Sequence, residues 1–207
     1  MKTSHRIGLI GDDLGTSLSP AIHQAEAAAL GLGPYSYEAI DLAGIPEPDL
    51  RELLARSLAE GFTGFNVTHP YKQAIMAHLD SLDPTATALG AVNTVVVGPH
   101  GLTGHNTDHS GFLSGLRRTL PEDERHDAVV LFGAGGAGSA VAAALLDFGV
   151  RELRIIDTDS GRLGQLHETL KLVHPTGAGV RVETGSPGWP GNGSGRQTGW
   201  SMRLPLG

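Results

Sequence analysis

The first half of the chain alternates short apolar runs with amphipathic segments. The apolar runs predict strands at residues 7–10, 35–41, 62–67, 92–97 and 102–104. Apolar residues spaced three and four apart predict helices at residues 20–30, 50–59 and 70–79. Strands that alternate with helices in this way are typical of an α/β domain with a largely parallel sheet.

The second half repeats the alternation. A helix at residues 112–116 is expected to connect two domains, and the charged segment 121–127 to be a linker. Further strands are expected at residues 129–132, 153–157 and 180–182, with helices at 139–148 and 160–172. We therefore predict an N-terminal α/β domain over residues 1–110 and an incomplete second α/β domain over residues 111–183.

The last segment, residues 184–207, has no apolar period and is rich in glycine and proline. Nine of the 30 glycines of the chain lie within the last 33 residues of the chain, residues 175–207. We interpret this segment as an irregular tail of the kind that a shifted reading frame or another premature end would produce. A natural flexible linker is the alternative.

Composition narrows the class of protein. A chain of 207 residues, 40% of them hydrophobic and 18% charged, can form one packed domain or two small ones. The net charge of −7 argues against nucleic-acid binding. The sequence has no apolar run of membrane length, no leader-like start and no cysteine, so we expect a cytoplasmic protein without disulfides.

A glycine-rich loop follows the expected strand at 129–132. Its glycines satisfy the pattern G-x-G-x-x-G, and the loop opens an alanine-rich helix. An acidic residue follows at a strand end, 19 residues after Gly138. Such glycines make a tight turn, let the main chain approach a pyrophosphate and allow close helix packing. The candidate cofactor-binding residues are Gly133, Ala134, Gly135, Gly136, Ala137, Gly138 and Asp157. A glycine turn without a ligand is the structural alternative.

Asp157 favours NAD over NADP as the cofactor. Its carboxylate can accept hydrogen bonds from a ribose diol but would repel a 2′-phosphate. Arg154 and Arg162 are close in sequence, and neither clearly replaces the acid. We therefore expect NAD, with NADP as the alternative.

Four polar clusters in the first half are larger than helix caps require. They are Ser17-Leu18-Ser19-Pro20, Asn66-Val67-Thr68-His69-Pro70-Tyr71-Lys72, Ala91-Val92-Asn93-Thr94 and Gly104-His105-Asn106-Thr107-Asp108. In this order, with the glycine-rich loop after them, they resemble the motifs of the shikimate dehydrogenase family over roughly residues 5–175. The His-Pro-Tyr-Lys variant and Asp157 are similar to the NAD-preferring quinate/shikimate branch of that family.

The resemblance implies a substrate domain followed by a Rossmann-type dinucleotide domain. It implies the interconversion of 3-dehydroshikimate and shikimate, or of the quinate pair, in aromatic amino-acid biosynthesis or quinate breakdown. Lys72 and Asp108 match the acid/base pair of the family, with Lys72 as proton donor to the ketone. From the residues themselves, a helix begun by Pro70 would place Lys72 in its first turn, where the dipole lowers the pKa of the ammonium and Asp108 opposes this.

Substrate binding also follows from the resemblance. Ser17 and Ser19 resemble a pair that binds a carboxylate through hydroxyl groups, and the ring hydroxyls of the substrate would be bound by Asn66, Thr68, Lys72, Asn93 and Asp108. The structural alternatives are that Ser19 and Thr68 only cap helices and that Lys72 is a solvated surface residue. His105 and His109 lack a convincing third ligand, so we expect no metal site.

Later segments of the family, including one beside the nicotinamide and a final substrate-binding helix, have no counterpart in this sequence. We therefore expect a truncated copy with impaired catalysis, and we leave a homodimer open. One alternative is a non-catalytic remnant that binds an anionic metabolite. Another is an enzyme similar to methylene-tetrahydrofolate dehydrogenase, against which the Ser-x-Ser-Pro and Asn-Thr-Asp clusters argue.

Overall fold

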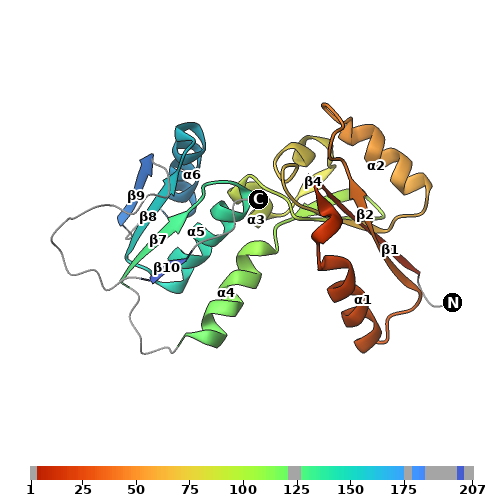
Figure 1. Ribbon diagram of the computed structural model, residues 1–207, viewed down its shortest axis with the longest axis horizontal. Coiled ribbons are helices and arrows are strands. Elements are labelled where there is room, and N and C mark those ends of the chain that lie inside the picture. Colours follow the sequence, from red (N-terminus) through yellow and green to blue (C-terminus); the bar gives the residue numbers. More distant parts are fainter. Residues whose placement is uncertain (1–3, 121–126, 175–178, 185–199, 203–207) are drawn as a thin grey trace. The chain divides into compact units, whose positions relative to one another are not determined.

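The computed structural model describes residues 4–120, 127–174, 179–184 and 200–202 (Figure 1). The chain divides into two compact units. The first comprises the chain up to Thr87 together with Ala91–Asn106, and the second comprises Ala88–Gly90 and the chain from Thr107 onward. Each unit contains one sheet, and each is described by itself below.

The first unit contains a mixed six-stranded sheet in the order β2-β1-β3-β5-β6-β4. Parallel pairing joins β1 to β2, β1 to β3 and β4 to β6, while β5 pairs antiparallel with both β3 and β6. The strands are β1 (His5–Gly11), β2 (Tyr35–Asp41), β3 (Gly64–Val67), β4 (Ser81–Leu82), β5 (Thr94–Gly98) and β6 (Gly101–His105).

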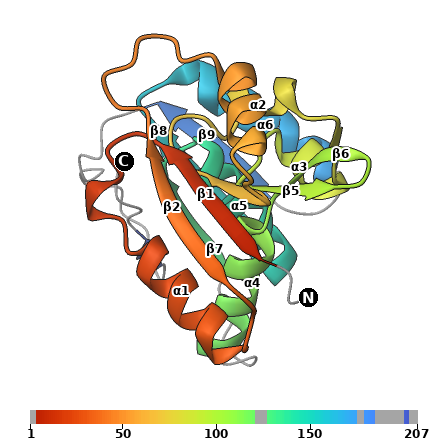
Figure 2. The same ribbon diagram turned by 90° about the vertical axis from the view of Figure 1, so that its right-hand side faces the viewer.

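Helices lie against both faces of this sheet, because neighbouring residues of a strand point to opposite sides. Ile10 of β1 belongs to a core that includes Leu53 and Leu54 of α2 (Leu50–Ala59). Leu9 packs on the other face with Tyr37, where α1 (Ser19–Ala29) lies along β2, as Figure 2 shows. The remaining helices of this region are η1 (Leu14–Thr16), η2 (Ala74–His78) and α3 (Pro84–Leu89).

The second unit contains a four-stranded parallel sheet in the order β10-β7-β8-β9. Its strands are β7 (Ala128–Phe132), β8 (Glu152–Asp157), β9 (Gly179–Thr184) and β10 (Trp200–Met202). Its helices are α4 (Asp108–Thr119), α5 (Gly136–Phe148) and α6 (Ser160–Val173). The order strand, helix, strand, helix, strand confirms the predicted α/β class for this half of the chain.

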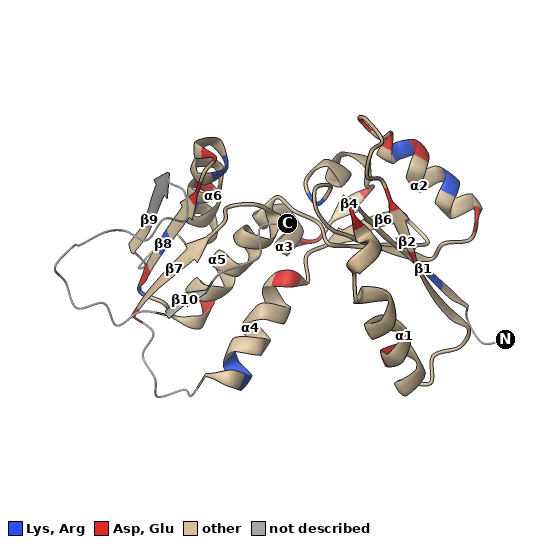
Figure 3. Ribbon diagram, in the orientation of Figure 1, with Lys and Arg blue, Asp and Glu red and all other residues tan. Residues whose placement is uncertain are grey.

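Helix α5 is the centre of the second core. All its residues from Gly138 to Leu146 are buried, between α4 and the strands β7 and β8. Figure 3 shows the contrast with the surface helix α2, whose ribbon carries charges of both signs. Gly149 ends α5 with φ of 101°, a left-handed conformation that glycine adopts without steric cost.

The structure differs from the sequence-based prediction in four places. Strand β4 and helix α3 occupy a stretch for which no element was expected. Helix α4 is longer than expected and belongs wholly to the second unit. Strand β10 lies within the segment expected to be irregular, and it pairs with β7. The predicted helix at residues 70–79 is replaced by a turn and the 3-10 helix η2.

Within the described ranges, no helix is both long enough and apolar enough to cross a membrane.

Candidate functional site

The loop after β1 carries the two candidate carboxylate-binding serines. The carboxylate of Asp41 holds this loop, because its oxygens accept the amides of Asp13 at 3.1 Å and Leu14 at 2.9 Å. Hydrogen bonds from Ala43 and from these amides lower the pKa of Asp41, so the carboxylate is charged at neutral pH. The loop is therefore shaped by a side chain from the neighbouring strand β2.

Ser17 and Ser19 have different local roles from those expected. Ser19 is the first residue of α1, whose N-cap is Leu18, so the prediction that Ser19 caps this helix is wrong. Instead, the Ser17 Oγ atom accepts a hydrogen bond from the Ser19 amide at 3.3 Å. Ser17 provides this bond because its short side chain can reach the amide two residues ahead.

Asn66 contacts Tyr37, a residue that the sequence patterns did not single out. The Tyr37 hydroxyl donates to Asn66 Oδ1 at 2.9 Å. Tyr37 is only 4% exposed, and burial raises its pKa to about 12. Its hydroxyl is therefore neutral at physiological pH. The His23 ring of α1 stacks on it, with centroids 4.5 Å apart.

The amide of Asn66 extends this network to the third polar cluster. Its nitrogen donates to the main-chain oxygen of Asn93 and to Thr94 Oγ1, each at 3.3 Å. Thr94 in turn donates to Asn93 Oδ1 at 2.9 Å. The register places Leu9 opposite Asn66 and Asn66 opposite Thr94, so β3 and β5 present these side chains on the face that α1 covers.

Thr68 follows the end of β3 and packs against the end of β1. Its amide donates to the Ile10 carbonyl at 2.9 Å. A Cβ atom added at Gly11 would collide with the Thr68 side chain, so only glycine lets the two strand ends meet this closely. Parallel strands place such ends at one edge of a sheet, where ligands of α/β proteins bind.

Lys72 lies in a turn rather than in the first turn of a helix. Its carbonyl accepts the Val92 amide at 2.8 Å, a long-range bond, and is therefore not used in a continuing helical ladder. The Thr68 carbonyl accepts the Tyr71 amide at 2.9 Å, which closes the turn. The prediction that Thr68 caps a helix here is therefore wrong, and the helix-dipole argument for Lys72 does not apply.

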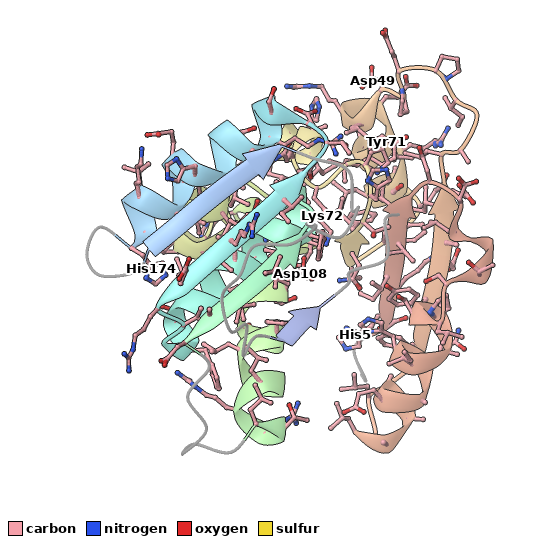
Figure 4. All side chains as sticks on the ribbon, turned by 60° about the vertical axis from the view of Figure 1, so that its left-hand side comes forward. His5, Asp49, Tyr71, Lys72, Asp108 and His174 are labelled. Carbon is pink, nitrogen blue, oxygen red and sulfur yellow. The ribbon has the colours of Figure 1, made fainter. Side chains whose placement is uncertain are left out.

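Tyr71 fastens this turn to the loop after β1. Its hydroxyl donates to Asp12 Oδ1 at 2.7 Å, and the Asp12 amide donates to the His69 carbonyl at 3.1 Å. Tyr71 and its neighbour Lys72 are labelled in Figure 4. Burial and the Asp12 carboxylate raise the pKa of Tyr71 to about 12. The segment that carries Lys72 and the segment that leads to Ser17 are thus held together by two hydrogen bonds.

Asp108, also labelled in Figure 4, belongs to the second unit. It is the first residue of α4, after the N-cap Thr107. An acidic residue at the start of a helix, with Arg117 and Arg118 in the last turn, complements the helix dipole. The adjacent His109 is fixed by Asp147 of α5, with Nε2 and Oδ2 2.8 Å apart.

The glycine-rich loop turns from β7 into α5. Gly133 has φ of 103°, a left-handed conformation that other residues rarely adopt. A Cβ atom at Gly138 would collide with the Gly133 main-chain oxygen, and it would lie 2.9 Å from the Gly133 carbonyl carbon. Gly135 is the N-cap and has nothing within 4 Å of its would-be Cβ atom. The first amides of α5, from Gly136 onward, have no acceptor within the helix itself.

Asp157 stands at the end of β8 beside this loop. Its Oδ2 atom accepts the Ala134 amide at 2.7 Å, and its Oδ1 atom accepts the Asp159 amide at 2.8 Å. Partial burial opposes ionisation, but these two bonds and the charge of Arg162 prevail and lower the pKa of Asp157. Each carboxylate oxygen can accept a second hydrogen bond, so the group retains capacity for a diol.

The first unit brings together Tyr37, Asn66, Thr94 and Asn93 through side-chain hydrogen bonds, and it connects Lys72 to the same strand ends through the main chain. Local sequence patterns gave Tyr37, Tyr71 and Asp12 no role. The only available signal was the position of Tyr71 within the second polar cluster. Within the described residues, no group of three or more histidines and acids is arranged to hold a metal ion.

Comparison with known proteins agrees with this architecture. Residues 9–95 match the model of the shikimate dehydrogenase substrate binding domain. The chain is 49% identical to the NADP⁺ shikimate dehydrogenase of Arthrobacter sp. strain FB24 over 164 residues, which are 78% of this chain and 55% of that protein. It is 46% identical to the NAD⁺ quinate/shikimate dehydrogenase of Corynebacterium glutamicum strain R, over 82% of this chain and 60% of that protein.

Solved structures give the same result. Quinate dehydrogenase from Corynebacterium glutamicum in complex with NAD matches with a TM-score of 0.77 and 43% identity, over 87% of this chain and 64% of that one. Shikimate 5-dehydrogenase from Listeria monocytogenes, in complex with shikimate and NAD, matches with a TM-score of 0.71 and 32% identity, over 87% of this chain and 61% of that one.

The fold and the matches define an α/β protein with a shikimate dehydrogenase substrate-binding domain followed by a parallel α/β unit. The chain belongs to the shikimate dehydrogenase family. It spans about 55–60% of the length of the curated relatives named here.

Proposed function

We propose that this chain carries the substrate site and the adenosine side of the dinucleotide site of a shikimate or quinate/shikimate dehydrogenase. The reaction is the interconversion of 3-dehydroshikimate and shikimate, or of the quinate pair. The observation that carries the proposal is the linked polar cluster of Tyr37, Asn66, Thr94 and Asn93 at the strand ends of a family substrate domain. A polyol acid needs many fixed hydrogen-bond partners, and this cluster supplies hydroxyl and amide groups.

Each substrate-facing residue has a proposed role. Ser17 and Ser19 bind the substrate carboxylate through their hydroxyl groups. Asn66, Thr68 and Asn93 bind the ring hydroxyls, and the side-chain amides give both donors and acceptors for that task.

Lys72 and Asp108 are proposed as the acid/base pair. In the reducing direction, the ammonium of Lys72 donates a proton to the ketone oxygen, and the carboxylate of Asp108 orients the lysine and the substrate hydroxyl. In the oxidising direction, Lys72 receives the proton from the hydroxyl. The turn that carries Lys72 is held by the Tyr71 hydrogen bond to Asp12, so its main chain is fixed before substrate arrives.

The residues of the second unit fit the adenosine and pyrophosphate parts of a nicotinamide dinucleotide. The collision that a side chain at Gly138 would cause, and the open space at Gly135, match a loop that the pyrophosphate approaches closely. When bound, the dinucleotide accepts or supplies the hydride of the reaction. Asp157 would bind the ribose diol. Its low pKa keeps it charged at neutral pH, which disfavours a 2′-phosphate, so we propose NAD as the preferred cofactor.

Calorimetric titration of the chain with shikimate and with quinate tests the substrate site. We expect saturable binding of at least one acid, and the Lys72→Met variant should retain that binding within about threefold because the lysine acts in the transition state. NADH formation should be absent in that variant. If neither acid binds the parent chain, the proposed substrate site is wrong.

The cofactor proposal has a separate test. Titration with NAD and NADP should show tighter binding of NAD. Asp157→Asn should narrow the difference in affinity between the two cofactors, because it removes the charge that repels a 2′-phosphate. If the parent chain binds NADP more tightly than NAD, the proposed preference is wrong.

A further inference from the structure

One buried hydroxyl contacts a candidate substrate-binding residue. Tyr37 of β2 donates to Asn66 Oδ1 at 2.9 Å. Its ring is enclosed by Leu9 and by the stacked His23 ring. Such packing holds the hydroxyl in one place.

The direction of each hydrogen bond in this network follows from one group that can only accept, the main-chain oxygen of Asn93. The main-chain oxygen of Asn93 can only accept, so the Asn66 side chain must turn its nitrogen toward it. Asn66 Oδ1 then faces Tyr37, and the tyrosine must donate its only proton there. Because that proton is committed, the Tyr37 oxygen has only acceptor capacity left.

The same constraint continues to the other side of Asn66. The amide nitrogen of Asn66 also donates to Thr94 Oγ1, so the threonine proton is directed at Asn93 Oδ1. The Asn93 side chain therefore turns its oxygen toward Thr94 and directs its nitrogen elsewhere. The protons that link Tyr37, Asn66, Thr94 and Asn93 Oδ1 therefore all point the same way along this path.

We propose that Tyr37 is a positioning residue, which holds the side-chain amide of Asn66 in place for binding a polyhydroxylated carboxylic acid. This inference rests on the proposed function. Without the Tyr37 hydroxyl, Asn66 Oδ1 loses its buried donor, and the amide is held only from the side of Asn93 and Thr94. The side chain then moves more freely, and the affinity for a ligand falls.

The test is calorimetric titration of the full chain with shikimate, comparing Tyr37→Phe with Tyr35→Phe. Tyr35 lies on the same strand and packs against the same small cluster, so the control makes the same chemical change without touching Asn66. We expect Tyr37→Phe to weaken shikimate binding by about three- to tenfold, the equivalent of one hydrogen bond, and Tyr35→Phe to leave it within about twofold.

A double-mutant cycle separates positioning from general destabilisation. If Tyr37 acts through Asn66, adding Tyr37→Phe to Asn66→Ala should weaken binding by less than about twofold further. An additive loss in the double variant overturns the proposal, because the tyrosine would then act independently of Asn66. Equal losses in the two tyrosine variants overturn it as well.

Failure of the inference differs from failure of the proposed function. A parent chain that does not bind shikimate contradicts the proposed function, whereas a parent that binds and a Tyr37→Phe variant of equal affinity contradict the inference alone. If Tyr37→Phe does not fold, Thr94→Val breaks the same chain on the other side of Asn66. The same loss and the same non-additivity with Asn66→Ala are then expected, and unchanged affinity overturns the proposal.

Discussion

The two units build their candidate sites from different parts of the polypeptide. In the first unit, side chains from β2, β3 and β5 are hydrogen-bonded to one another, and Asn66 lies at the centre. In the second unit, the main chain of one loop forms the candidate site, and a single carboxylate, Asp157, holds it. A site made of side chains can be retuned one contact at a time, whereas in a site made of main chain one added Cβ atom, as at Gly138, displaces the loop itself.

The largest effect is expected from a substitution that disrupts the glycine-rich loop between β7 and α5. Gly138→Ala places a Cβ atom against the Gly133 carbonyl, and because both partners are main chain, the loop or α5 must shift. We expect a loss of about 2 kcal/mol or more in the free energy of unfolding, together with loss of NAD binding. Urea unfolding and NAD titration measure the two effects.

Gly164→Ala is the matched control for that variant. Gly164 lies in α6, it is exposed, and nothing lies within 4 Å of its would-be Cβ atom. The same substitution should there stabilise the protein by about 0.5–1 kcal/mol, because alanine favours helix. Equal effects of the two substitutions would show that the contact of Gly138 with Gly133 is unimportant.

A smaller effect is expected where a single side-chain bond of the first unit is removed. Tyr71→Phe deletes the hydroxyl that donates to Asp12 and keeps the buried ring. We expect a loss of about 1–2 kcal/mol in the free energy of unfolding, measured with urea, since the bond has a carboxylate acceptor. Asp12→Asn keeps an oxygen for Tyr71 and should cost less. If Tyr71→Phe is as stable as the parent, the bond from Tyr71 to Asp12 does not hold the Lys72 turn in place.

The smallest expected effect concerns Asp157 and depends on pH. The pKa of Asp157 in the folded protein lies below its ordinary value of 3.8. Its contribution to stability is therefore present above that value and is lost as the pH falls through the folded pKa. Asp157→Asn should be less stable than the parent at neutral pH, by about 1 kcal/mol, and the difference should shrink below roughly pH 4. Thermal unfolding at several pH values measures this. A constant difference would contradict the role of the charge.

Much of the fold followed from local patterns in the sequence. The predicted boundaries of β2 and α2 agree with the structure, because alternation and helical spacing are properties of neighbouring residues. The glycine-rich loop was also recognisable, since its four glycines lie within six consecutive residues and Gly133 adopts the positive φ that such a turn requires.

The segment from Thr68 to Leu79 shows where local patterns fail. Its apolar spacing is helical, but the Lys72 carbonyl bonds to Val92, twenty residues away, and the helix gives way to a turn and η2. The start of α1 also differs from the local pattern, because its N-cap is Leu18 and Ser19 is its first residue.

By itself, the sequence determined the α/β class, the order of the motifs and the residue types offered to a substrate and a dinucleotide. Only the tertiary structure decided how those residues are connected. The bond from Tyr37 to Asn66 spans 29 positions, and that from Tyr71 to Asp12 spans 59. Such pairs meet only after the sheet has set the register of its strands, and the direction of each proton depends on all the partners at once.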